Sequence, residues 1–131
     1  MNLQRYTLAT VAVFVFIFAY DFVVHGYLLN GLYMETAAVW RPQGESIMWV
    51  MNISQILSAA FFTLLFTRHY EGKGLREGLR FGMYVGALLA ALQLGCYMYL
   101  PVPFSIVGYW MLSAFVMSLG IGAVLSFTYR A

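Results

Sequence analysis

Four long apolar stretches, separated by short connections, leave this chain few possible folds. They cover about residues 6–29, 47–67, 81–100 and 104–129. A membrane-spanning helix needs roughly 20 consecutive apolar residues, so each stretch is long enough for one crossing. A transmembrane barrel would need segments that alternate in polarity, and runs such as VAVFVFIFAY do not alternate. The pattern predicts an all-α integral membrane four-helix bundle.

The composition excludes several other classes of protein. Hydrophobic residues make up 63% of the 131 residues and charged residues 9%, whereas soluble domains average about 45–50% and about 25%. So few charges do not cover the surface of a soluble globule. The net charge of +2 argues against a nucleic-acid partner, and the single cysteine excludes an internal disulfide. We therefore expect one transmembrane domain over residues 1–131, with no cofactor.

The basic residues are distributed unevenly over the two sides that four spans define. One side holds both chain ends and the second connection, and it carries six of the seven Lys and Arg residues: Arg5, Arg68, Lys73, Arg76, Arg80 and Arg130. The opposite side carries Arg41 alone. Because short cytoplasmic segments are enriched in Lys and Arg, we predict cytoplasmic termini and a location in a bacterial inner membrane.

The two polar connections are expected to differ in structure. Between spans one and two, the segment GLYMETAAVW has helical spacing of apolar residues and predicts a short interfacial helix. Between spans two and three, Glu71, Glu77 and four basic residues are expected to form a solvated face that meets anionic lipid headgroups.

Small residues recur every four positions on the last two spans. Helices in lipid associate through close backbone approach and polar contacts, which small residues permit. A tight turn at Pro101–Pro103 makes the two spans antiparallel neighbours. We therefore predict a closely packed hairpin, with a seam formed by two ladders of small residues: Gly78, Gly82, Gly86 and Ala90 on one span, and Ala114, Ser118, Gly122 and Ser126 on the other.

Polar side chains occur at similar depth in all four spans, in the half expected to face the outside. An ionisable group near a helix centre costs about 2.5–3.5 kcal/mol, so it is expected to face the bundle interior. This predicted polar layer comprises Asp21, Gln55, Gln93 and Ser113, with His25 and Asn52 one step nearer the outside.

Asp21 and His25 are four residues apart and so share one helical face. Three functional interpretations are open: the pair relays protons, it supplies two ligands to a metal with Glu35, Glu45 or Cys96 nearby, or Asp21 binds a cationic substrate. A fourth interpretation is structural, with the polar layer acting as hydrogen bonds between helices.

A further candidate is a docking patch of Trp40, Arg41 and Trp49, since Trp and Arg are enriched at interface hot spots.

Together these features favour a small non-catalytic accessory or assembly subunit of a larger inner-membrane complex, in contact with lipid and with other membrane subunits or further copies of itself. The alternative is an oligomeric small transporter or proton-coupled channel that uses Asp21 and His25. A third possibility is an outer-face metal-binding protein or enzyme.

Overall fold

The computed structural model of this chain describes residues 2–130, and it confirms the all-α four-helix bundle. Four helical segments are long and apolar enough to cross a membrane. The elements in chain order are α1 (Leu3–Val23), the π-helical turn η1 (Val24–Leu28), α2 (Asn30–Glu35), the 3₁₀ turns η2 (Ala37–Val39) and η3 (Gln43–Glu45), α3 (Met48–Arg68), α4 (Leu75–Cys96) and α5 (Phe104–Thr128). The chain is an integral membrane protein.

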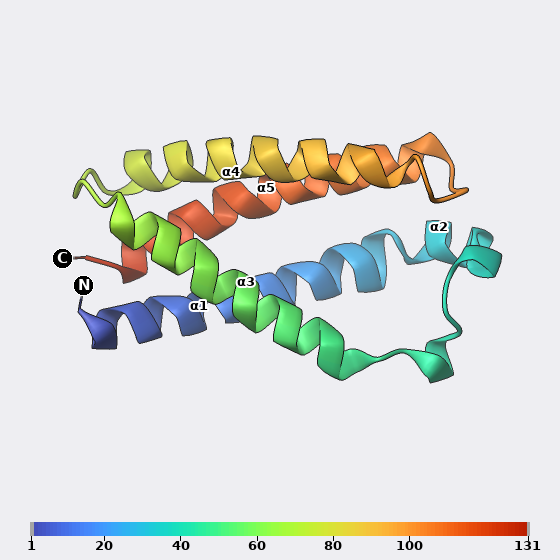
Figure 1. The fold of residues 1–131 in the computed structure, drawn as a ribbon, viewed down its shortest axis with the longest axis horizontal. Coiled ribbons are helices and arrows are strands. Elements are labelled where there is room, and N and C mark those ends of the chain that lie inside the picture. Colours follow the sequence, from blue (N-terminus) through green and yellow to red (C-terminus); the bar gives the residue numbers. More distant parts are fainter. Residues whose placement is uncertain (1, 131) are drawn as a thin grey trace.

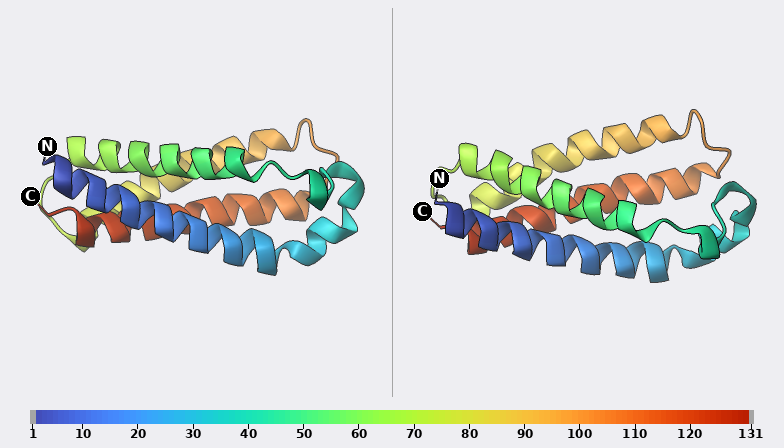
Figure 2. Two further views of the ribbon diagram at one scale, coloured as in Figure 1. Left: turned by 90° about the horizontal axis from the view of Figure 1, so that it is seen from below. Right: turned by 60° about the horizontal axis from the view of Figure 1, so that its bottom comes forward.

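The helices lie lengthwise in the molecule, and both termini are at one end (Figure 1). We call this the terminal end, and it also holds the connection between α3 and α4. The opposite end, which we call the loop end, holds α2, the 3₁₀ turns and the connection between α4 and α5 (Figure 2). The predicted short helix between spans one and two is present as α2, at the loop end.

Helices α4 and α5 form the most extensive helix pair in the bundle. Their backbones approach closely where the two ladders meet. A Cβ atom placed on Gly78 would lie 2.8 Å from the carbonyl carbon of Gly122, and one on Gly82 would lie 2.8 Å from the Cα of Leu119. Gly78, Gly82 and Gly122 are all buried in this seam. No residue larger than glycine fits at these positions without moving the backbone.

Helix α1 packs against both α3 and α5 and joins them to each other. The buried side chains on these helices include Ala9, Val13, Ile17, Ala59, Phe66, Ile121 and Leu125, which form one apolar cluster. Two tyrosines reinforce the contacts: the Tyr6 hydroxyl donates to the Ala60 carbonyl at 2.9 Å, and the Tyr20 hydroxyl donates to the Ser113 carbonyl at 2.9 Å. By contrast, α3 makes only slight contact with α5.

The third span begins at Leu75 rather than at the predicted Phe81, and it ends at Cys96 rather than at Leu100. The prediction assigned the charged segment before Phe81 to the connection, and it also treated Glu77 as solvated. Both expectations are wrong, because Glu77 is 4% exposed in the first turn of α4. Its carboxylate accepts the backbone N–H groups of Glu71 at 2.6 Å and Lys73 at 2.8 Å.

This carboxylate explains why the charged residues before Phe81 form the first turns of α4. The first N–H groups of a helix and the turn before it lack partners, and a Glu in the first turn satisfies such donors. The turn itself needs two residues with positive φ, and Gly72 (φ +75°) and Gly74 (φ +63°) supply them. Glu71 remains exposed and forms ion pairs with Lys73 and with Arg80, the latter at 2.7 Å.

We expect Glu77→Gln to lower the free energy of unfolding by about 1–3 kcal/mol, because the substitution turns an amide NH₂ towards a buried backbone donor. Thermal unfolding in a mild detergent measures this change. Glu71→Gln is the matched control, and it is expected to change stability little, because exposed ion pairs contribute little. Equal loss of stability in the two variants would contradict the capping role of Glu77.

Candidate functional site

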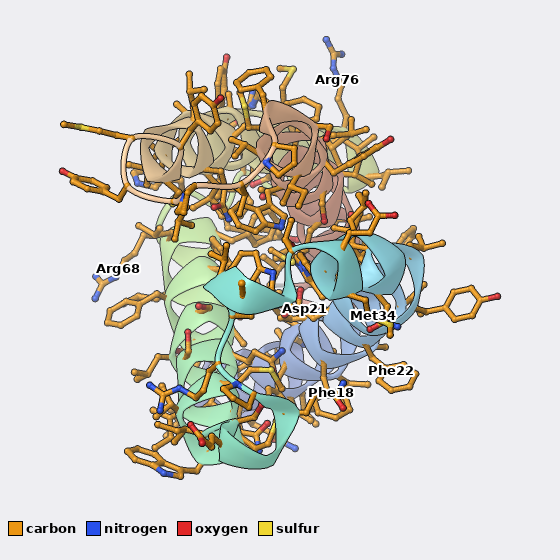
Figure 3. All side chains as sticks on the ribbon, turned by 90° about the vertical axis from the view of Figure 1, so that its right-hand side faces the viewer. Phe18, Asp21, Phe22, Met34, Arg68 and Arg76 are labelled. Atoms are coloured by element: carbon orange, nitrogen blue, oxygen red, sulfur yellow. The ribbon has the colours of Figure 1, made fainter. Side chains whose placement is uncertain are left out.

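The candidate site lies inside the loop-end half of the bundle and is centred on Asp21 of α1. Viewed from the loop end, Asp21 lies near the middle of the bundle behind α2, whereas Phe18 and Phe22 of the same helix point outward (Figure 3). The Gln55 amide of α3 donates to Asp21 Oδ2 at 2.8 Å. Gln55 is 5% exposed and the Asp21 side chain is 28% exposed, so this hydrogen bond joins two helices at a partly buried position.

His25 lies beyond Asp21 in the π-helical turn η1. The Leu29 N–H donates to the Val24 carbonyl at 2.8 Å, which is the five-residue spacing of a π-helix. Single π turns inside α-helices occur frequently at functional sites. The turn leaves His25 Nε2 4.0 Å from Asp21 Oδ1. This distance is longer than a direct hydrogen bond and is suited to one bridging water molecule.

Tyr33 of α2 connects His25 to α5. The Trp110 indole N–H donates to the Tyr33 hydroxyl at 2.7 Å, and the same hydroxyl lies 2.7 Å from His25 Nδ1. An indole N–H is only a donor, so Tyr33 accepts from Trp110, and its own hydrogen is free to donate to His25. With Tyr33 as the donor, Nδ1 is the acceptor in neutral His25 and the ring proton is on Nε2, the nitrogen nearer Asp21.

Aromatic rings enclose Tyr33 at the loop end. His25 stacks on Tyr33, while Trp40 meets both Tyr33 and Trp110 edge to face, at centroid distances of 5.5 and 5.9 Å. Burial raises the pKa of the Tyr33 hydroxyl, the hydrogen bond from Trp110 partly opposes this, and the charge of Asp21 raises it further. Tyr33 therefore stays protonated near neutral pH and remains a donor to His25.

Two buried acceptors on α3 have no hydrogen-bond partner among residues 2–130: Oδ1 of Asn52, and Oε1 of Gln55, whose amide N–H bonds Asp21. Buried polar groups in proteins are nearly always paired with protein or with ordered water. Both atoms belong to α3, at positions three residues apart, so they are one helical turn from each other. Both oxygens are therefore available to accept from water or from a protonated group.

The remaining residues of the predicted polar layer have other partners. Ser113 contacts Tyr20, whose hydroxyl it approaches at 3.3 Å, and so belongs to the contact between α1 and α5. Gln93 on α4 accepts from the Cys96 thiol at 3.9 Å, and no hydrogen bond joins it to Asp21. The structure therefore brings together Asp21, Gln55 and His25, with Asn52 nearby on α3.

The three residues of the predicted docking patch point to different surroundings. Trp40 is half-buried in the aromatic cluster, and its indole N–H donates to Thr36 at 2.8 Å. Arg41 is exposed, and Trp49 is 66% exposed at the start of α3.

Within residues 2–130, no three His, Cys, Asp or Glu side chains lie close enough to share a metal ion. Asp21 and His25 are therefore not joined there by Glu35, Glu45 or Cys96.

The sequence interpretation missed Tyr33 and Trp110 as members of the site. Neither residue was identifiable as a site residue, because their partners come from segments far apart in the chain. Trp110 and Tyr33 are 77 residues apart. The one local signal was His25 eight residues before Tyr33, a spacing that has meaning only once the π-helical turn η1 and α2 are known to lie between them.

We expect Tyr33→Phe to change the tautomer of His25, because the variant removes the only O–H that donates to Nδ1 in the described network. Nitrogen NMR of isotope-labelled histidine is the measurement. In the wild type we expect the Nε2–H form, and in the variant a mixture of the two forms. A His69→Gln background leaves His25 as the only histidine. An unchanged Nδ1 resonance in Tyr33→Phe would show that Tyr33 does not donate to His25.

In comparisons of this chain with protein-family models, curated proteins and solved structures, no match was found.

Proposed function

We propose that this protein is a small transporter that carries protons across the membrane, with Asp21 binding a proton delivered from the loop end. The observation that carries the proposal is the series Tyr33–His25–Asp21: a hydrogen bond joins Tyr33 to His25, and 4.0 Å separates His25 Nε2 from an intramembrane carboxylate. Ionisable side chains inside a membrane are costly and commonly mark proton or ion pathways. The excess of basic residues at the terminal end supports an orientation in which the loop end faces the outside.

Each proton step has a named donor and acceptor. Tyr33 passes its hydroxyl proton to His25 Nδ1 and takes a replacement from water at the loop end, while the Nε2 proton of His25 moves to Asp21 Oδ1 through one water. This leaves His25 in the Nδ1–H form, and rotation of its partly exposed ring restores the starting arrangement before the next proton. Gln55 accommodates both forms of Asp21: its Nε2–H donates to the carboxylate, and after the amide flips, its Oε1 accepts from the carboxylic acid. The buried, unpartnered Oε1 is thus ready for the protonated form.

The half of the bundle nearer the termini supports a transporter rather than an open channel. The core there is formed by apolar side chains such as Val13, Ile17 and Ile121, which are at most 3% exposed. Thr63 and Ser118 are buried in the same region, but their hydroxyls donate to carbonyls of their own helices. A proton on Asp21 therefore has access to the loop end alone, and release to the other side requires a second conformation. The π turn η1 is a natural hinge for that change.

Proteoliposomes that enclose a pH-sensitive dye test this function. Imposing an inward pH gradient is expected to acidify vesicles that contain the protein faster than protein-free vesicles of the same lipid. Because the pathway alternates between two conformations, the rate is expected to saturate as the gradient increases. A rate equal to that of protein-free vesicles would exclude proton transport as the function of this chain.

A second candidate function is that of an accessory or assembly subunit, and the open face of α3 favours it. Ser54 and Ser58 lie four residues apart in a shallow groove on α3 that is otherwise lined by apolar side chains. Small residues at this spacing let another transmembrane helix approach closely. The groove is lined by α3 alone, so a helix of another subunit has room to pack there.

Native mass spectrometry after purification in a mild detergent tests the second candidate. A larger membrane partner that is retained by the wild type, lost in Ser58→Leu and retained in Ser105→Leu supports the subunit role. Ser105 is an exposed serine of α5 outside the groove and serves as the matched control. A monomer without partners would contradict this role.

A further inference from the structure

A groove at the terminal end, between α4 and α5, combines basic and apolar side chains. Its volume is about 690 Å³. Lys73, Arg76 and Arg80 line the part nearest the terminal end, where α4 begins. Further along the two helices the groove is lined by apolar side chains: Leu79, Met83, Phe115 and Leu119. Because α4 crosses the membrane, the cations lie at its boundary and the apolar part extends into the hydrocarbon region.

The charges of the groove are only partly balanced by the protein itself. Glu71 pairs with Lys73 and Arg80. Glu77 also lines the groove, but its carboxylate is occupied by two backbone N–H groups. Arg76 has no ion pair among residues 2–130, and its side chain extends away from the bundle (Figure 3). The three cations therefore exceed the two carboxylates, and one guanidinium is available to a ligand.

We infer that this groove binds one anionic phospholipid, with the phosphate at Arg76 and an acyl chain along Leu79 and Met83. Arg76 and Leu79 are three residues apart and Leu79 and Met83 four, so they line one face of α4 in that order. A guanidinium binds phosphate through paired, charge-assisted hydrogen bonds. Basic pockets between transmembrane helices on the cytoplasmic side bind acidic headgroups in this way. The inference is independent of the proposed proton site at the opposite end.

The groove differs from the rest of the terminal end in having both parts of a lipid site. Arg68 is also an exposed cation near this end, but it lies on a different side of the bundle and does not line the groove (Figure 3). Nonspecific electrostatic attraction between the protein and anionic lipids depends equally on Arg68 and Arg76. Binding of a lipid in the groove depends on Arg76 alone of these two residues. This difference supplies a matched pair of variants.

The experiment is native mass spectrometry of the full chain in a mild detergent with equal amounts of dioleoylphosphatidylglycerol and dioleoylphosphatidylcholine. We expect the wild type to retain one phosphatidylglycerol in preference to phosphatidylcholine. Arg76→Gln is expected to weaken phosphatidylglycerol binding about five-fold, the effect of one basic side chain near an anionic surface. Arg68→Gln is expected to bind as the wild type does.

Met83→Trp tests the apolar part without changing any charge. Met83 is 45% exposed, so a larger side chain fills the groove without entering the seam between the helices. We expect this variant also to lose phosphatidylglycerol, and thermal unfolding in lipid-free detergent verifies that each variant is folded. Equal binding by Arg76→Gln and Arg68→Gln, or wild-type binding by a folded Met83→Trp, would overturn the inference in favour of diffuse attraction.

Discussion

Gly82→Leu is expected to separate α4 from α5 and to lower the stability of the bundle by about 3 kcal/mol or more. Overpacking a well-packed site typically costs about 1–3 kcal/mol when neighbouring side chains adjust. Here the atoms that face Gly82 belong to the backbone: its Cβ would lie 2.8 Å from the Cα of Leu119 and 2.9 Å from the carbonyl carbon of Ser118. Backbone atoms of a helix cannot rotate away, so the whole helix has to move.

Thermal unfolding in detergent measures the loss of stability, and the distance between spin labels on α4 and α5 measures the separation. Gly95→Leu is the matched control on the same helix, since nothing lies within 4 Å of a Cβ at that position. It is expected to leave the stability unchanged or slightly higher, because leucine favours a helix more than glycine does. Equal stability of the two variants would mean that α4 and α5 do not depend on the seam.

Asp21→Asn is expected to reduce proton uptake by proteoliposomes to the rate of protein-free vesicles. Asparagine has nearly the same shape and still offers an oxygen to the Gln55 amide, but it has no carboxylate to take the proton of His25. Removing a charge from a membrane span is also favourable. We therefore expect the variant to keep or slightly exceed the thermal stability of the wild type while it loses proton uptake.

Glu35→Gln is the control for this substitution. It makes the same change from carboxylate to amide at an exposed position of α2, also at the loop end. Proton uptake by Glu35→Gln is expected to match that of the wild type. Normal uptake by a folded Asp21→Asn would exclude Asp21 from the proton pathway and would leave its hydrogen bond to Gln55 as a purely structural contact.

The sequence by itself determined that the chain lies in a membrane, how many times it crosses, and which two helices form one closely packed pair. Uncharged apolar runs are stable as helices in lipid whatever their neighbours, because each helix satisfies its own backbone hydrogen bonds. The pairing of α4 with α5 was also readable, since a short turn makes the two spans neighbours and ladders such as Gly78 and Gly82 are local patterns. Asp21 was recognisable as a candidate because a lone carboxylate in a span is unusual.

Only the tertiary structure decided which polar groups meet. Asp21 and Gln55 are 34 residues apart and Tyr33 and Trp110 are 77 apart, so their contacts depend on how separate helices are oriented. The charged start of α4 was mispredicted for a similar reason: Glu77 is buried because a preceding turn folds back over its carboxylate. Hydropathy measures how well one segment suits lipid, whereas the partner of a polar side chain is set by neighbouring segments, which hydropathy does not describe.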